Sequence, residues 1–97
     1  MNTIINAAKF TASAELEKFI NDKVAKLDRL VDNATRCEVT LKIDKPESVG
    51  NKVAEISISL PGQTLFNSQQ NNPFEQAVSD CVDAMKVQIE KYKERYK

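Results

Sequence analysis

Basic side chains gather on two segments of this 97-residue chain, and they are its best candidates for binding chemistry. The first segment carries Lys23, Lys26 and Arg29, spaced three residues apart. The last twelve residues hold five bases and two acids, a net charge of +3, in a chain whose formal net charge is zero. Positive side chains on one surface attract phosphates, and each phosphate contact releases counterions. The two segments therefore suggest a surface that follows a nucleic-acid backbone.

The residue types that most catalytic and metal sites need are scarce. Histidine is absent, which removes Ser-His-Asp triads, histidine acid–base chemistry and most zinc sites. Two glycines, Gly50 and Gly62, are too few for a phosphate-binding glycine-rich loop. No pair of carboxylates stands in a pattern typical of catalysis. We therefore expect no enzyme activity, catalytic residue, metal, cofactor or small-molecule substrate.

The cysteines and the apolar runs bear on where the chain works. Cys37 and Cys81 form no CxxC motif, and both fall on apolar faces, so we interpret them as small core residues. Met1–Lys9 lacks a basic start followed by an apolar run, and no 18 consecutive residues are apolar. The sequence predicts a cytoplasmic chain with reduced thiols, no membrane partner and a single domain over residues 1–97.

Two segments have the apolar spacing of amphipathic helices. The first helix is predicted over Ala14–Val31, with Ser13 as its N-cap. The second begins at the sequence Asn-Pro-Phe-Glu, where Asn72 can cap, Pro73 suits the first helical position and Glu75 can complete a capping box. Its apolar face runs from Phe74 to Tyr92, so this helix continues close to the last residue.

Four segments are predicted to be strands. Thr3–Ala8 is a short apolar run, whereas Arg36–Asp44 and Ala54–Leu60 alternate apolar and polar residues, as half-buried antiparallel strands do. Pro61-Gly62 is a tight turn, and Gln63–Gln70 follows it as the fourth strand. The order β-α-β-β-β-α predicts an α+β fold with both helices packed on one face of a four-stranded sheet.

The bases occupy one flank of each predicted helix. At about 100° per residue, Lys26 and Arg29 lie beside the apolar arc of the first helix, and Lys23 lies inside it. On the second helix, Gln88, Lys91 and Arg95 share one side. Bases near a helix C-terminus also complement the helix dipole, which is the ordinary explanation for this pattern. If the two flanks adjoin, they form one stripe for phosphates, and that is our prediction.

Four stretches resemble the short form of the ribosome hibernation-promoting factor family, also called ribosome-associated inhibitors or sigma-54 modulation proteins. They are Leu16–Leu30, the alternating strand Cys37–Ile43, Gly62–Leu65 and Val82–Lys93. The match covers nearly the whole chain, and its specificity comes from the ordered set. Because the chain ends after the second helix, we expect it to lack the further domain by which long forms pair ribosomes.

The resemblance implies a fold similar to a double-stranded-RNA-binding domain and a protein of stress and stationary phase. It also implies a non-enzymatic translation inhibitor that occupies the mRNA and A- and P-site tRNA channel of the small ribosomal subunit. The expected partners are that subunit and its rRNA. Ala84, Val87 and Glu90 stand where relatives often carry a base. The family's basic positions map onto Lys23, Lys26, Arg29, Gln88, Lys91 and Lys93, and our candidate rRNA-binding set adds Arg95.

Two alternatives stay open. The chain could be a generic RNA-binding domain with another target, or a protein-interaction module that docks through its second helix. Binding through phosphates weakens steeply with salt, whereas docking on a protein does not have to, so a salt series separates these classes.

Overall fold

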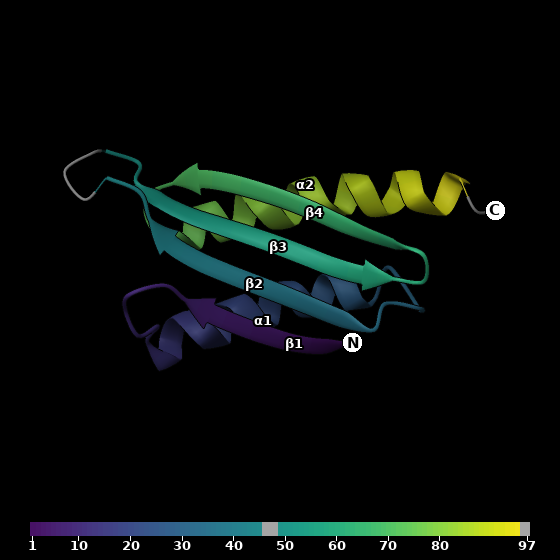
Figure 1. Ribbon diagram of the computed structural model, residues 1–97, viewed down its shortest axis with the longest axis horizontal. Coiled ribbons are helices and arrows are strands. Elements are labelled where there is room, and N and C mark those ends of the chain that lie inside the picture. Colours follow the sequence, from purple (N-terminus) through teal and green to yellow (C-terminus); the bar gives the residue numbers. More distant parts are fainter. Residues whose placement is uncertain (46–48, 96–97) are drawn as a thin grey trace.

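The computed structural model describes residues 1–45 and 49–95, which form one four-stranded sheet and two helices (Figure 1). The chain order is β-α-β-β-β-α, as the sequence predicts, and this confirms the α+β fold. The elements are β1 (Asn2–Ala7), α1 (Ala14–Asp28), β2 (Arg36–Ile43), β3 (Lys52–Leu60), β4 (Gln63–Asn71) and α2 (Phe74–Arg95).

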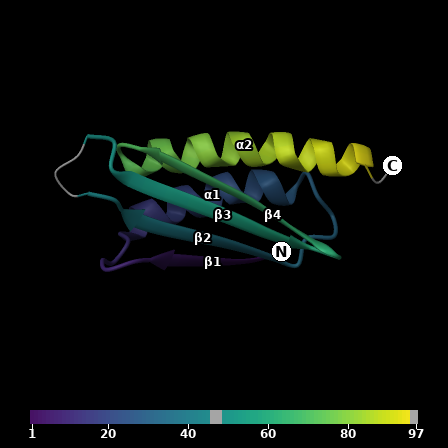
Figure 2. The ribbon, with the colours of Figure 1, turned by 45° about the horizontal axis from the view of Figure 1, so that its top comes forward.

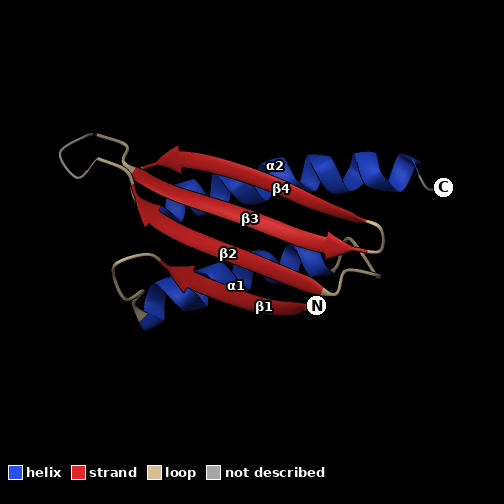
Figure 3. Cartoon of the chain, viewed as in Figure 1, coloured by secondary structure: helices blue, strands red, loops and turns tan. Residues whose placement is uncertain are grey.

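The strands lie in chain order across the sheet, with β1 parallel to β2 and the other pairs antiparallel. A parallel pair needs a crossover, and α1 supplies it on the face where α2 also packs (Figure 3). α1 lies behind β1 and β2, and α2 lies behind β3 and β4 (Figures 1 and 2). The two helices run side by side in the same direction, so their C-terminal ends point to the same end of the molecule.

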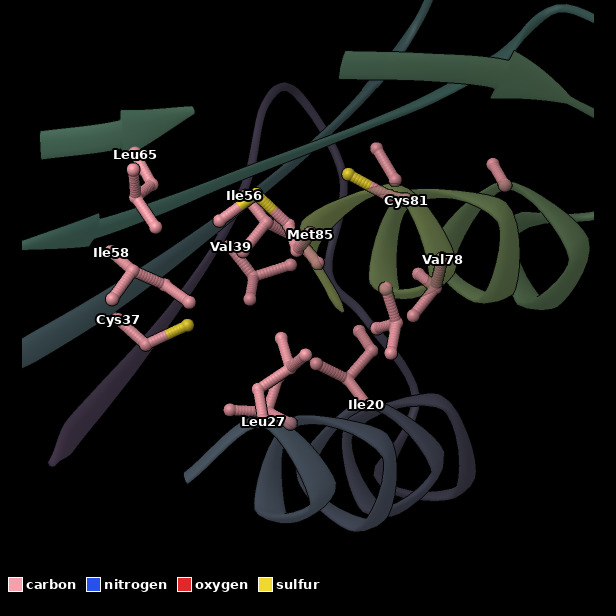
Figure 4. Packing of buried hydrophobic residues seen from close by; sticks show 14 of the residues in the cluster. Ile20, Leu27, Cys37, Val39, Ile56, Ile58, Leu65, Val78, Cys81 and Met85 are labelled. Atoms are coloured by element: carbon pink, nitrogen blue, oxygen red, sulfur yellow. The ribbon is translucent and has the colours of Figure 1, made fainter. Parts of the chain in front are cut away.

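The core lies between the sheet and the two helices (Figure 4). The period-2 alternation of β2 and β3 turns Cys37, Val39 and Ile56 toward the helices, where they are fully buried. The helices contribute the apolar side chains that the sequence predicts, and these are buried: Leu16, Ile20, Leu27, Val78, Val82 and Met85. The opposite face of the sheet carries a Lys42–Glu55 ion pair of 3.0 Å, and its exposed apolar side chains include Phe66.

Ile43 departs from this pattern, because the alternation along Arg36–Asp44 predicts that it faces the core with Cys37 and Val39, and it is 43% exposed. β1 ends at Ala7, which pairs with Leu41, so no strand flanks β2 at Ile43 on that side. There Ile43 lines an open hollow of about 490 Å³ with Ala8 and Lys9. The apolar–polar alternation of β2 continues to its last residue, although the neighbouring strand β1 ends earlier.

α1 ends at Asp28, three residues before the predicted end at Val31. The Leu30 amide bonds to the Leu27 carbonyl, a tighter turn that closes the helix, and the chain then bends toward β2. Val31 is nevertheless buried. Its apolar spacing reflects packing of the turn on the core and not a further helical turn. The Ser13 hydroxyl accepts a bond from the Leu16 amide at 3.1 Å, which confirms the N-cap.

α2 begins at Phe74, one residue later than predicted. The carbonyl of Pro73 accepts bonds from the amides of Gln76 and Ala77, so Pro73 takes the capping position expected for Asn72. Phe74 stacks on Phe10 with 5.2 Å between ring centroids, which ties the start of α2 to the loop after β1. Within residues 1–45 and 49–95, neither helix is long and apolar enough to cross a membrane.

Candidate nucleic-acid interface

α1 turns its acidic flank toward β1. Asp28 accepts a bond of 3.1 Å from the N-terminal ammonium of Met1, and Glu17 lines a hollow with Ile5 and Ala7 of β1. The opposite flank, which carries Lys26, must therefore face the other side of the helix, where α2 lies.

The three candidate bases of α1 differ in exposure. Lys26 and Arg29 are exposed, whereas Lys23 is partly buried, as expected for a base inside the apolar arc. The ammonium of Lys23 lies 5.5 Å from the centroid of the Phe19 ring, a cation–π contact that holds the amine at the margin of the core. Arg29 follows the last helical residue and its backbone N–H closes the helix on Ala25.

α2 turns Gln88 toward β4. The Nε2 of Gln88 donates a 2.8 Å bond to the carbonyl of Phe66, and Asn71 donates a 2.9 Å bond to Asp80 on the same flank. Lys91 and Arg95 line a hollow of about 190 Å³ with Gln63 and Leu65, at the start of β4. We call Gln88, Lys91 and Arg95 the β4-side surface.

The predicted single stripe is therefore wrong, because the two basic flanks do not adjoin. The flank with Lys26 faces α2, but the flank with Lys91 and Arg95 lies on the side of α2 away from α1. A helical wheel gives the angle of a side chain from the apolar face. It does not say which side of that face turns toward the neighbouring helix, since that depends on how the helices are placed across the sheet.

Other bases of α2 face α1 instead. Lys86 lies two residues before Gln88 and Lys93 five residues after it, so both point roughly 140–160° away from Gln88 and the strand that it contacts. We call Lys23, Lys26, Lys86 and Lys93 the interhelical surface, with Arg29 at its solvent margin. Lys86 is absent from the candidate set drawn from the sequence, because its flank is defined only once α1 is in place.

Acidic side chains lower the positive charge of the interhelical surface. Asp83 lies 3.9 Å from the Lys86 ammonium, and both groups are solvated, so this pair is weak. Asp22 and Glu90 are exposed nearby on their helices. The surface is basic in its arrangement but modest in net charge.

The thiols supply no reactive group. Cys37 and Cys81 are fully buried, which confirms them as core residues. Burial raises the pKa of Cys37 to about 11 and that of Cys81 to about 12. The Cys81 thiol donates to the Asn67 carbonyl at 3.2 Å. In the described part of the chain, no three His, Cys, Asp or Glu side chains gather as a metal-ligand set.

A four-stranded sheet, covered on one face by two parallel helices that expose bases on separate flanks, defines the structural class of the protein. Residues 3–97 match the family described as Sigma 54 modulation protein / S30EA ribosomal protein, and the chain belongs to this family. The resemblance drawn from the sequence is thus confirmed.

Similar proteins agree with this assignment. The chain is 24% identical over 82 residues to a ribosome hibernation promotion factor of Deinococcus radiodurans, covering 84% of this chain and 43% of that protein. It therefore spans less than half of that relative. The fold superposes with a TM-score of 0.86 on a ribosomal subunit interface protein from Coxiella burnetii, at 18% identity over 97% of this chain and 99% of the other. With the N-terminal domain of Thermus thermophilus Protein Y the TM-score is 0.77, at 23% identity over 95% and 99%.

Proposed function

We propose that this chain is a non-enzymatic hibernation factor that binds rRNA of the small ribosomal subunit and inhibits translation. In this proposal it occupies the channel used by mRNA and by A- and P-site tRNA, and it acts in the cytoplasm. Membership of a family of ribosome-associated proteins supports the proposal, as does the name of the Deinococcus relative.

The observation that carries the rRNA contact is the interhelical surface. Lys26 on α1 and Lys93 on α2 are both exposed. Their flanks lie opposite those that contact β1 and β4, so they face one another. Ammonium groups on neighbouring helices can contact successive phosphates of one RNA strand, without reading its sequence. Lys23, Arg29 and Lys86 extend this surface. The β4-side surface, with Gln88, Lys91 and Arg95, then contacts a separate segment of rRNA.

Binding of the chain to purified small subunits, measured by co-sedimentation across a salt series, tests the proposal. Lys26→Gln with Lys93→Gln should weaken binding and reduce the salt slope by about one unit for each phosphate that the variant no longer binds. The matched control replaces Lys9 and Lys45, which are exposed where β1 and β2 end, at the other end of the molecule. Both double variants remove two positive charges, so any general charge effect is the same.

The outcomes separate the alternatives. Equal weakening by both double variants would show a general charge effect and would overturn the interhelical contact. Tight binding to unrelated structured RNA with the same affinity favours a generic RNA-binding domain. Binding that does not change with salt favours docking on a ribosomal protein. Translation in a purified system, measured with the same variants, shows whether binding also inhibits.

A further inference from the structure

β4 is an edge strand without the charged side chains and prolines that usually prevent pairing. Its nine residues, Gln63–Asn71, include no charged side chain and no proline. Gln88 of α2 bonds to its Phe66 carbonyl, but a carbonyl oxygen can accept a second bond. Natural edge strands commonly carry lysine or proline, or are short, because an open edge pairs readily with another strand. β1, the other edge, is shorter, with six residues.

The backbone of β4 alternates between β3 and the open edge. Leu60 and Gln63 flank the two-residue turn at Pro61-Gly62, and such a flanking pair is bonded through both backbone groups. Alternate residues from Gln63 onward therefore bond to β3, and the residues between them direct their N–H and C=O groups outward: Thr64, Phe66, Ser68 and Gln70. The bond from Gln88 to the Phe66 carbonyl agrees with this assignment.

The flank of α2 above this edge changes character along its length. Asp80 comes first, and its bonds from Asn71 and Gln76 lower the pKa of its carboxyl, so it is charged at neutral pH. Ala84 follows, about 40° from Gln88 around the helix, and it is partly buried. Lys91 and Arg95 come last, and both are exposed. The flank is thus acidic, then apolar, then basic.

This order of charges along α2 is complementary to that of a second α2 running in the opposite direction. We propose that two copies of this chain associate through antiparallel pairing of their β4 edges, which joins two four-stranded sheets and lays the two α2 helices side by side. A two-fold axis then brings the Asp80 carboxylate of each copy toward Lys91 of the other. It also brings Ala84 onto Ala84 of the second copy. The contact with Lys91 covers part of the β4-side surface, so the dimer is a free form of the chain that dissociates before that surface binds rRNA.

Contacts between α2 and β4 place the axis. Cys81 bonds to Asn67 and Gln88 bonds to Phe66, so the level of Asn67 along α2 falls between those two residues, near Ala84. With the axis at Asn67, Phe66 pairs with Ser68 of the second copy and Thr64 pairs with Gln70. These are the residues whose backbone groups point outward. Backbone pairing is therefore compatible with the axis that the α2 contact indicates.

The spacing of the layers also fits. Strands lie about 4.8 Å apart, and α2 packs on both β3 and β4. Two α2 helices in a continuous sheet would then be separated by about 10–12 Å, close to the usual distance between packed helices. Small side chains, as at Ala84, allow that approach. A strand from an unrelated protein could form hydrogen bonds with the open backbone groups of β4, but it would not match the charge order of α2.

Sedimentation equilibrium of the full chain over a range of concentrations tests the proposal. We expect a reversible monomer–dimer equilibrium. Ala84→Glu should raise the dimer dissociation constant at least about tenfold, because it places two carboxylates near the axis. Val49→Glu is the matched control, since Val49 is 96% exposed and lies in the β2–β3 connection, so dimerisation should not change.

A charge reversal keeps the test specific. Lys91→Glu alone should weaken the dimer, and Lys91→Glu combined with Asp80→Lys should restore it. Hydrogen exchange provides a second measurement, in which the amides of Thr64, Phe66, Ser68 and Gln70 gain protection as concentration rises. A chain that stays monomeric at about millimolar concentration, or that dimerises equally well with Ala84→Glu and with Val49→Glu, overturns the proposal.

Discussion

Asn33 donates a hydrogen bond of 3.1 Å from its Nδ2 to the hydroxyl of Tyr92. Asn33 lies in the loop after α1 and Tyr92 in the last turns of α2, so this bond joins segments 59 residues apart in the chain. It links the two helices at the end where Lys26, Arg29 and Lys93 lie. A neutral polar contact therefore stands beside these bases.

Removal of this bond should cost little stability. Tyr92→Phe keeps the ring and removes the hydroxyl, and the pair is solvated, so we expect a decrease of about 0.5–1.5 kcal/mol in the free energy of urea unfolding. Asn33→Ala should cost a similar amount, and the double variant should cost less than the sum of the two single variants. Strict additivity would show that the bond is not formed in solution.

The core should respond to truncation according to burial. Ile56 is fully buried between Ala54 and Ile58 on the helix-facing side of β3, so Ile56→Ala should lower the free energy of unfolding by about 2–5 kcal/mol. Ile43→Ala should cost under about 1 kcal/mol, because Ile43 is at the exposed end of β2. Denaturant unfolding of the two variants measures the difference. A similar decrease for both would contradict the register of the sheet.

The buried thiols predict a loss of stability at alkaline pH. Burial raises the pKa of Cys37 and Cys81 from the ordinary value of 9.0 to about 11 and about 12. Above pH 9 the unfolded chain releases these protons while the folded chain keeps them, so stability falls as pH rises, by about 1 kcal/mol per pH unit for each thiol. Cys37→Ala with Cys81→Ala should flatten this slope in unfolding measured from pH 8 to 10.5, and should keep ribosome binding. An unchanged slope would argue against burial.

The cap of α1 should contribute measurably. Ser13→Ala removes the acceptor for the Leu16 amide and should cost about 1 kcal/mol, whereas Ser13→Asp should be neutral because its carboxylate can also cap. Thermal unfolding of the three proteins orders them. Equal melting temperatures for Ser13→Ala and the unchanged chain would show that this bond does not contribute to stability.

Lys86 should behave as a further phosphate contact. It lies on the flank of α2 that faces α1, and its pair with Asp83 is solvated and weak. Lys86→Gln should lower the salt slope of small-subunit binding by about one unit and leave stability nearly unchanged. Asp83→Asn is the informative companion, because it frees Lys86 and should strengthen binding. No change in slope with Lys86→Gln would exclude this contact.

Local patterns were sufficient for most of the fold. Alternation in β2 and β3 and the apolar spacing of both helices predicted the layers correctly, because burial of one face requires those periods. The patterns were wrong at boundaries, as at Val31 and Ile43, where tertiary neighbours decide. The parallel pairing of β1 and the orientation of Lys91 away from α1 depend on the placement of whole elements. No single segment encodes them.

The common direction of α1 and α2 has an electrostatic consequence along the length of the molecule. The peptide dipoles of the two helices add and do not cancel, which leaves partial negative charge where both helices end. Lys26, Lys93 and Arg95 stand in those last turns and oppose the negative charge, while Glu15 and Glu75 oppose the positive charge in the first turns. The domain should therefore approach a polyanion in a preferred orientation, with the end that carries the helix C-termini making the first contact.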